Sequence, residues 1–430
     1  MEQHDVIVIG AGLAGLRCAT RLAQEGLDVV VLEAADVVGG RERTDDVDGF
    51  RLDLGFHVLN PAYPAVRRWV DVDALRMRRF PVGVRVRREQ GGRGSGHGVG
   101  VLGHPLRHPS LILPTLRSGL VSPADLTAVT RWAVPVLLSP RRVIDGQDET
   151  LREGWDRAGL TGSLRAEVLE PFLAGVIADD TGTTSDVFVK LLVRMFALGR
   201  PGLPARGIGA LPVQLAAAAT DAGADIRLRQ TVTALTRRAT HTEVHVAHAD
   251  TVRARAAVVA VGPGVVADLV DIPAPVTKGL QTWWFDADAG AAASALISVD
   301  GRRAGPIVNT AVMSRTLPSY APAGRDLVQA TCLLPRAART DARAAPREAD
   351  VRRQLGEIWG TDAATWRLIR RDDIHDALPA QTAPLRTTSA ARIDDRIYVA
   401  GDHRDTASIQ GALVSGERIA RAVRADLRGD

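Results

Sequence analysis

Three glycines near the start of the chain have the spacing of a phosphate-binding turn. Gly10, Gly12 and Gly15 form a GxGxxG pattern, and Glu33 follows after about 20 residues. In such a turn the first glycine makes the tight bend, the second lets a pyrophosphate approach the backbone, and the third lets a helix pack closely on a strand. We therefore expect a dinucleotide to bind here, with Glu33 accepting hydrogen bonds from a ribose.

The elements around these glycines are those that the motif requires. Residues 5–9 form a β-branched apolar run typical of a strand buried on both faces, residues 16–24 have helical periodicity, and residues 27–32 form a second such strand. The helix start presents free amides and a partial positive charge to the phosphates. We expect these contacts from Leu13 and Ala14, and a ribose contact from Ala34 beside Glu33. The alternative, a glycine turn without a cofactor, does not explain the complete βαβ context.

Features at both ends of the chain favour FAD over NAD. Gly39, Gly40 and Arg41 lie six residues after Glu33, where an extended FAD would pass. Gly401 and Asp402 follow a last buried strand, and a carboxylate there suits the ribityl or phosphate end of FAD. The helix that closes the chain would direct its first amides at the flavin pyrimidine and stabilise negative charge there. The residues predicted at this helix start are Ser408, Ile409, Gln410 and Ala412.

These motifs resemble those of the FAD-dependent amine oxidase and phytoene desaturase superfamily. The resemblance rests on GAGLAGL at residues 10–16, GGRERT at 39–44, DLGF at 53–56 and GDHRDTASIQGALVSGERIA at 401–420. Residues 203–216 and 318–328 are similar to the shorter phytoene-desaturase-like members. The resemblance implies noncovalent FAD. It also implies that Gly55, Phe56 and His57 lie against the isoalloxazine, and that Val232, at the end of a strand, contacts the adenine end.

The chain departs from the superfamily where substrate chemistry is decided. The stretch Ser408-Ile409-Gln410 lacks the aromatic residue usual in monoamine-oxidase-like members, and no lysine follows the aromatic strand at 283–285. The chain is also shorter than most carotenoid desaturases. We therefore predict an FAD-dependent dehydrogenase of a small or lipophilic organic substrate, with oxygen or a quinone as electron acceptor. An amine or amino acid oxidase that releases hydrogen peroxide is the alternative. A binding protein of this fold without catalysis is another.

Few side chains are candidates for the reaction itself. His57 is a candidate base, which would take a proton while hydride leaves to flavin N5; a packing role is the alternative. Trp283 and Phe285 are predicted to line a substrate cavity, with core packing as the alternative, and Tyr320 is a further cavity candidate. The pattern at residues 262–267 resembles a second dinucleotide turn, but no acid-terminated strand follows it. No metal site is expected.

Length and composition set the broad class. The 430 residues are 46% hydrophobic and 24% charged, as in globular proteins of two or three domains. We predict an α/β fold: a Rossmann-type FAD-binding domain interleaved with an α+β substrate domain. The FAD-binding domain is assigned residues 1–75, 204–270 and 390–430, and the substrate domain residues 76–203 and 271–389.

Charge and hydropathy exclude other classes of protein. A net charge of +4 with 4% aromatic residues argues against nucleic acid binding. No stretch has the length and hydropathy of a transmembrane helix, and no signal peptide precedes the first strand, so a cytoplasmic location is expected. The arginine-rich stretch 76–93 is predicted to form a hairpin with a flexible tip, whose arginines either face solvent or contact anionic membrane lipid.

Overall fold

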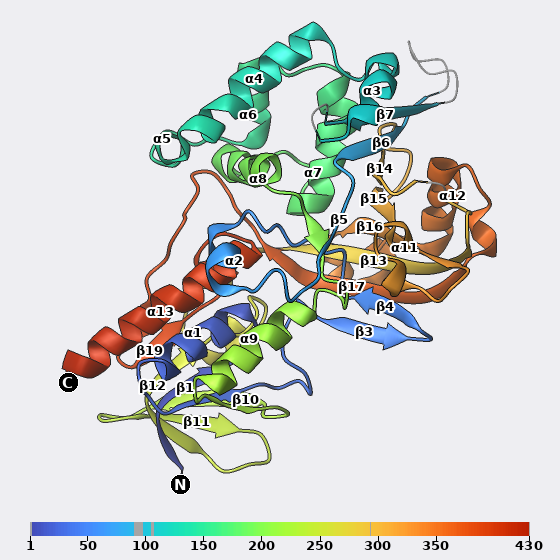
Figure 1. Ribbon diagram of the computed structural model, residues 1–430. Coiled ribbons are helices and arrows are strands. Elements are labelled where there is room, and N and C mark those ends of the chain that lie inside the picture. The colour runs from blue at the N-terminus through green and yellow to red at the C-terminus, as the bar shows by residue number, and fades with distance from the viewer. Residues whose placement is uncertain (1, 90–97, 105–106, 293, 430) are drawn as a thin grey trace.

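Two large sheets organise the molecule. The computed structural model describes residues 2–89, 98–104, 107–292 and 294–429. An eight-stranded sheet lies near both termini, a seven-stranded sheet lies beyond it, and a group of helices closes the end farthest from the N-terminus (Figure 1). These helices are α3 (Ile112–Ser118), α4 (Pro123–Leu138), α5 (Pro140–Ile144), α6 (Leu151–Ala158), α7 (Glu170–Ile177) and α8 (Asp186–Leu198). The predicted α/β fold class is confirmed.

The eight-stranded sheet joins three distant segments of the chain. Its centre is β1 (Gln3–Ile9), which pairs in parallel with β2 (Val29–Leu32) and β12 (Val252–Val259). Residues 6–9 and 29–32 are all buried, because helices and loops cover both faces of this parallel core. The parallel region extends to β9 (Asp225–Arg227) and β19 (Ile397–Val399), and the antiparallel strands are β10 (Val232–Arg237), β11 (Thr242–Val246) and β18 (Arg392–Asp394).

One strand boundary differs from the prediction. Val232 was expected at the end of a strand, but β9 ends at Arg227 and β10 begins at Val232. Arg229 has a left-handed backbone conformation, with φ of 57°, which interrupts the strand. Val232 therefore starts the next strand and does not end this one.

Three helices cover one face of this sheet. They are α1 (Leu13–Ala23), α9 (Ala210–Asp221) and α13 (Ile409–Gly429), and α1 packs against both others (Figure 1). The contact between α1 and α13 is close because Gly416 faces the backbone of Ala14: a Cβ on Gly416 would lie 2.2 Å from the Ala14 carbonyl oxygen. The first and last helices of the chain are thereby held together at the end of the sheet where the cofactor is expected.

An ion pair also joins these two helices. Arg17 donates from Nη2 to Glu417 Oε2 at 2.5 Å, and both residues are buried. We expect Glu417→Gln to lower the free energy of unfolding by about 3 kcal/mol, because the Arg17 charge loses its buried partner. Urea denaturation measures this loss. Glu348→Gln removes a half-exposed partner of Arg352 and should cost less than about 1 kcal/mol; equal losses in the two variants would contradict the prediction.

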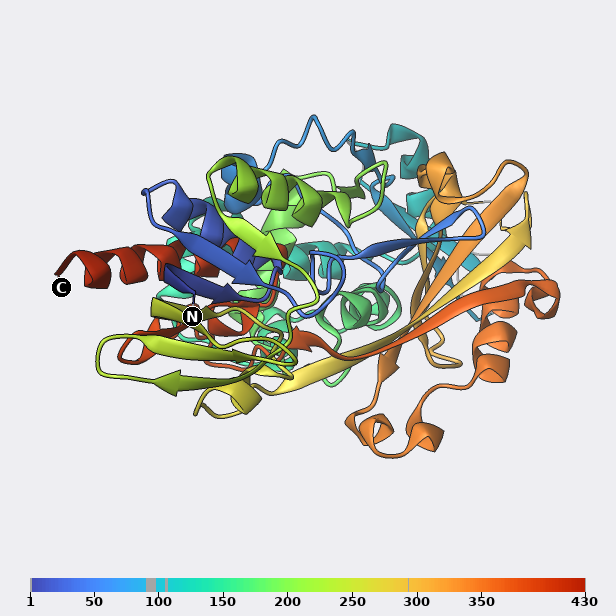
Figure 2. The ribbon, with the colours of Figure 1, turned by 90° about the horizontal axis from the view of Figure 1, so that it is seen from below.

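The seven-stranded sheet carries the longest strands. Its order is β17 (Arg367–Pro379), β13 (Thr277–Asp288), β16 (Arg325–Leu334), β15 (Ile307–Val312), β14 (Ile297–Asp300), β6 (Gly83–Arg87) and β7 (Val99–Gly103). β13 and β17 run from beside the first sheet along the full length of the second (Figure 2). Helix α12 (Glu348–Trp359) packs on one face, and the other face turns toward the eight-stranded sheet. The predicted domain boundaries remain a prediction.

Short elements complete the chain. They are β3 (Thr44–Val47) with β4 (Phe50–Asp53), β5 (Arg78–Arg79) with β8 (Gly202–Leu203), α2 (Pro64–Trp69), α10 (Val266–Leu269) and α11 (Met313–Thr316). Among the described residues, no helix combines the length and the apolar character needed to cross a membrane.

The arginine-rich hairpin differs in part from its prediction. β6 and β7 pair as a hairpin, and residues 90–97 at its tip lie outside the described residues. Arg88 is 7% exposed and bonds Glu167, while Arg85 donates to the carbonyl oxygen of Ile358 and lies over the Trp359 ring. These two arginines therefore serve internal packing and do not form a free basic face.

Candidate active site

The glycine-rich turn forms an open cradle at the start of α1. Gly12 precedes the helix, and no described side chain caps this end. A Cβ on Gly12 would meet nothing within 4 Å, so space is open in front of the first amides of the helix, those of Leu13 and Ala14. Gly10 has φ of +102°, and a Cβ there would lie 2.8 Å from the Ala260 carbonyl oxygen. The cradle has the shape and the donors that a pyrophosphate needs.

Glu33 lies at the carboxyl end of β2, beside this cradle. Its Oε2 accepts from the Ala11 amide at 2.7 Å, and its Oε1 accepts from the Ala35 amide at 2.8 Å. These bonds fix the carboxylate and leave lone pairs for ribose hydroxyls. The chain before Val232 runs alongside, since the Gln230 amide donates to the Glu33 carbonyl oxygen. Ala34 is exposed at this edge.

Arg41 connects the N-terminal segment to the C-terminal one. Gly39 bridges to Gly12, which places Gly40 and Arg41 next to the cradle. Arg41 donates from Nη2 to Asp402 Oδ1 at 2.6 Å and from Nη1 to the Ala377 carbonyl oxygen at 2.7 Å. Burial lowers the pKa of Arg41, but the nearby carboxylates, above all Asp402, outweigh it and raise the pKa. Residues 361 positions apart in sequence are thus brought together.

The start of α13 points its backbone amides into the same region. Ser408 caps the helix, because its Oγ accepts from the Gly411 amide at 3.0 Å and its carbonyl oxygen accepts from Ala412. The amides of Ile409 and Gln410 lie at the tip of the helix. The side chain of Gln410 accepts through Oε1 from the backbone amide of Ala65, so this oxygen is bound within the protein.

His403 carries the polar atoms that most clearly lack partners. Both ring nitrogens are buried and have no hydrogen-bond partner among the described residues. Burial lowers the pKa of His403 to about 4, so the ring is neutral at pH 7. The ring stands directly after Asp402 and beside Gly401, whose amide donates to Ser415. Buried polar atoms are almost always hydrogen-bonded, so this neighbourhood fits a polar ligand.

Another part of the candidate site is the segment Gly55, Phe56 and His57, which lies shortly after β4. His57 Nε2 donates to the Leu54 carbonyl oxygen at 2.8 Å, which puts the proton on Nε2 and leaves the Nδ1 lone pair available. Phe56 packs edge-on against Phe80. Gly55 has φ of +96°, and its near neighbours include Ile374 of β17 and Thr282 of β13. The two long strands of the second sheet therefore reach the segment at residues 55–57.

Two residues of the candidate site were not predicted from the sequence. Thr282 is fully buried, and its hydroxyl has no hydrogen-bond partner within the described chain. Burial raises the pKa of Glu42, although Arg41 and His57 lower it. Strand parity could have found Thr282, because it lies on the opposite face of β13 from Trp283. The position of Glu42 directly after the Gly-Gly-Arg run is the signal that marks that residue.

The predicted cavity residues lie in the core. Trp283 and Phe285 are at most 1% exposed, stack on each other, and pack with α12 on the face away from the cradle. Tyr320 is fully buried and donates its hydroxyl to Asp53 Oδ2. All three side chains therefore pack in the core, which was the alternative interpretation for Trp283 and Phe285. The β13 side chains on the face toward the cradle are those at the alternate positions of the strand.

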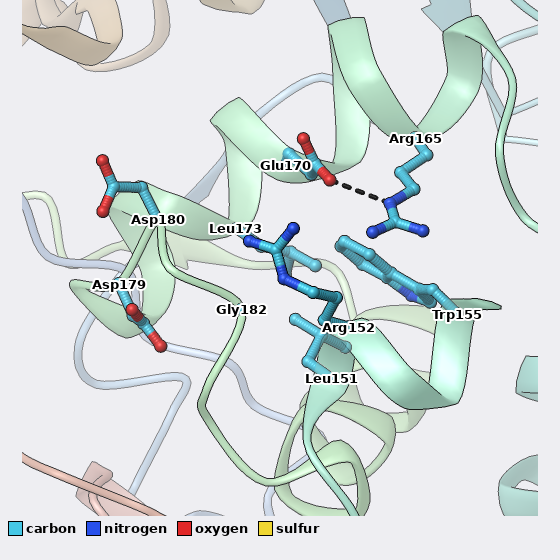
Figure 3. Close-up of a pocket in the computed structure, with 9 residues that line it drawn as sticks. All are labelled: Leu151, Arg152, Trp155, Arg165, Glu170, Leu173, Asp179, Asp180 and Gly182. Atoms are coloured by element: carbon cyan, nitrogen blue, oxygen red, sulfur yellow. Dashed lines mark hydrogen bonds and ion pairs between the residues drawn. The ribbon is translucent and has the colours of Figure 1, made fainter.

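Two cavities lie away from this constellation. One has a volume of about 20 Å³, room for about one water molecule, between α6 and the turn after α7 (Figure 3). The other, about 560 Å³, lies beside the C-terminal end of α13, whereas the candidate site is at the N-terminal end. The residues that line the smaller cavity are Leu151, Arg152, Trp155, Arg165, Glu170, Leu173, Asp179, Asp180 and Gly182. Neither contains a residue of the cradle.

Comparison with known families decides what this arrangement is. The family described as flavin containing amine oxidoreductase matches residues 13–424, nearly the whole chain. The chain belongs to this family. It is therefore a flavin-dependent oxidoreductase and binds FAD, which fits the cradle, the fixed Glu33 carboxylate and the unpartnered polar atoms of His403.

Curated relatives of this flavin oxidoreductase match over short segments. A putative flavin-containing monoamine oxidase, AofH, from Mycobacterium tuberculosis is 45% identical over 62 residues, 14% of each chain. A 4,4'-diaponeurosporene oxygenase from Staphylococcus haemolyticus is 40% identical over 63 residues, 15% of this chain and 12% of its own. The match thus spans about one seventh of the relatives' length. Both the amine oxidase and the carotenoid branches of the predicted resemblance are represented.

Solved structures match over the whole chain. An oxidoreductase from Methanosarcina mazei has a TM-score of 0.76 at 17% identity, with 97% of this chain and 100% of that chain covered. A putative protoporphyrinogen oxidase from Exiguobacterium has a TM-score of 0.70 at 19% identity, with 99% of both chains covered. At this identity the likeness establishes the fold, and the predicted amine oxidase/phytoene desaturase-like fold is confirmed.

Proposed function

We propose that this protein is an FAD-dependent dehydrogenase of a small, neutral, lipophilic organic substrate. The observation that carries the proposal is the set of side chains around Gly55, beside His57. Where the second sheet meets Gly55, the neighbouring side-chain atoms are those of Ile374 and Thr282, an aliphatic group and a neutral hydroxyl. Such a wall favours a neutral carbon skeleton over an ion, because an ion there would lose its hydration without a partner.

The chain's own residues would divide the binding of FAD among them. The amides of Leu13 and Ala14 would hold the pyrophosphate above Gly12, and Glu33 would hold the adenosine ribose. Arg41, Asp402 and the His403 ring would bind the ribityl and phosphate groups. The helix tip at Ile409 would place its positive end at the flavin pyrimidine. When bound, FAD supplies the hydride acceptor, at flavin N5.

His57 would accept the proton that the substrate loses. Its Nε2 is committed to the Leu54 carbonyl oxygen, so Nδ1 is the free base, and the same bond holds the ring in place. Dehydrogenation removes a hydride and a proton from adjacent substrate atoms, and an imidazole whose orientation is fixed and whose Nδ1 is free suits the second of these. Oxygen or a quinone would then accept the electrons.

Replacing His57 by Asn tests the proton role. We expect kcat to fall by about 100-fold while the protein keeps its FAD, because general-base catalysis contributes about that factor. Thr282→Val is the matched control, since it alters the wall and leaves the base in place: it should shift KM more than kcat. A His57→Asn enzyme with unchanged kcat would assign His57 to packing.

Amine oxidation is the second candidate, and Glu42 favours it. A carboxyl group beside His57 and Arg41 could pair with a substrate ammonium. Anaerobic reduction of the flavin absorbance separates the two candidates. Bleaching by neutral lipophilic alkenes or alcohols supports dehydrogenation. Bleaching by primary amines, lost in Glu42→Gln and followed by hydrogen peroxide release in air, would replace the proposal with amine oxidation.

A further inference from the structure

Helices α3, α4 and α5 lie at the end of the molecule farthest from the N-terminus (Figure 1). Helices α3, α4 and α5 carry six large apolar side chains that are strongly exposed. They are Ile112 at 41%, Leu113 at 53%, Leu116 at 74%, Leu126 at 58%, Leu138 at 78% and Ile144 at 39%. We call these six residues the apolar rim. Scattered exposed leucines are ordinary, but so many on three consecutive helices mark a surface that is covered by something else.

α3 shows this most clearly. The sequence of this helix is Ile-Leu-Pro-Thr-Leu-Arg-Ser, yet Ser118 is its only buried residue. Its inner side is fixed to β7, because the Gly103 amide donates to Thr115 Oγ1 at 2.9 Å. The helix is therefore held in place by its polar side while Leu113 and Leu116 face outward. If its leucines belonged to the core, the helix would direct Leu113 and Leu116 inward and its polar side toward solvent.

Positive charge predominates around the apolar rim, although the exposed Asp145 directly follows Ile144. From residue 107 to residue 144 the sequence contains a single acid, Asp125, which is 4% exposed and caps α4 through Ser122. The arginines in the same range are Arg107, Arg117, Arg131, Arg141 and Arg142. Arg107 and Arg131 bond main-chain carbonyl oxygens, whereas Arg117, Arg141 and Arg142 are exposed.

We propose that the α3–α4–α5 surface docks on an anionic lipid bilayer. Exposed leucines beside three exposed arginines, with Asp145 as the one exposed acid among residues 107–145, are complementary to a negatively charged headgroup layer over an acyl core. An acidic protein surface would match the arginines but would leave the leucines exposed. The apolar rim would enter the headgroup–acyl boundary, and Arg117, Arg141 and Arg142 would pair with lipid phosphates. This contact lies on other residues than the arginine-rich stretch 76–93.

Vesicle binding by the FAD-loaded protein tests the proposal. The probe is a sedimentation assay with phosphatidylcholine vesicles that contain about one third phosphatidylglycerol, beside vesicles of phosphatidylcholine alone. We expect binding to the anionic vesicles that weakens at high salt. The double variant Leu113→Ser/Leu116→Ser should weaken it by about tenfold or more, and Arg141→Gln/Arg142→Gln should do so at low salt.

Val213→Ser is the matched control, because Val213 is 60% exposed on α9, outside the apolar rim. It should bind as the parent does. Retained flavin absorbance and an unchanged melting temperature show that each variant is folded. Absence of binding, or equal binding by all variants, would overturn the proposal. A parent that self-associates without lipid, and becomes monomeric in Leu113→Ser/Leu116→Ser, would also overturn it, because the apolar rim would then be an interface between copies of this chain.

Discussion

Gly12→Val should yield a folded protein that has lost its FAD. A Cβ at this position has no protein atom within 4 Å, so the side chain enters only the space in front of α1. That space is where the pyrophosphate must approach the backbone. We expect affinity for FAD to fall by about a hundredfold or more, equivalent to about 2.7 kcal/mol. Equilibrium dialysis or quenching of FAD fluorescence measures the change.

The structure also predicts what this variant should retain. Its far-UV circular dichroism should match that of the parent stripped of FAD, and its unfolding should differ from that of the stripped parent by less than about 1 kcal/mol. Loss of FAD together with loss of fold would not support the cradle. A Gly12→Val protein as yellow as the parent would place the pyrophosphate elsewhere.

Gly15→Ala should have the opposite effect and damage the fold itself. A Cβ here would lie 2.0 Å from the Gly10 carbonyl oxygen and 3.2 Å from Ala260 Cβ, so α1 must move away from the sheet. Glycine to alanine within a helix ordinarily stabilises it by about 1 kcal/mol. At Gly15 we expect a loss of at least about 2 kcal/mol, because both neighbours belong to the packed parallel core. Urea denaturation of the protein without FAD measures it.

Gly12→Ala is the matched control for this prediction. It adds the same single carbon three residues away, where nothing within 4 Å opposes it. Its apoprotein should remain within about 1 kcal/mol of the parent. If both alanine variants unfold alike, the two glycines do not have the separate roles that the structure assigns to them.

The sequence was most informative where local chemistry determines structure. Gly10, Gly12 and Gly15 are required by backbone geometry over a few residues, and Glu33 follows at a spacing set by one βαβ unit, so their placement could be predicted without tertiary information. Arg41 and Asp402 were each predicted to lie along the FAD, but the direct contact between them was not predicted. Nothing local brings residues 361 positions apart into an ion pair.

The side chains near the substrate could not be chosen in the same way. Trp283 and Phe285 were predicted to line the cavity because they are aromatic. Side chains alternate along β13, however, so both lie on the face that α12 covers. Thr282 lies on the other face, toward the cofactor region. Which face of a strand is functional depends on what packs on each side, and that is a tertiary property. The break between β9 and β10 at Arg229 has the same origin, because the chain turns there to follow β2.

The visible spectrum of the purified protein, recorded before and after acid denaturation, tests the central claim most directly. We predict flavin bands in the native protein and complete transfer of the chromophore to the supernatant, where its mass identifies FAD. Bands that remain with the precipitate would contradict noncovalent binding. A colourless protein that takes up no added FAD would contradict the account of the site, because the cradle at Gly12, Glu33 and Arg41–Asp402 would then hold no cofactor.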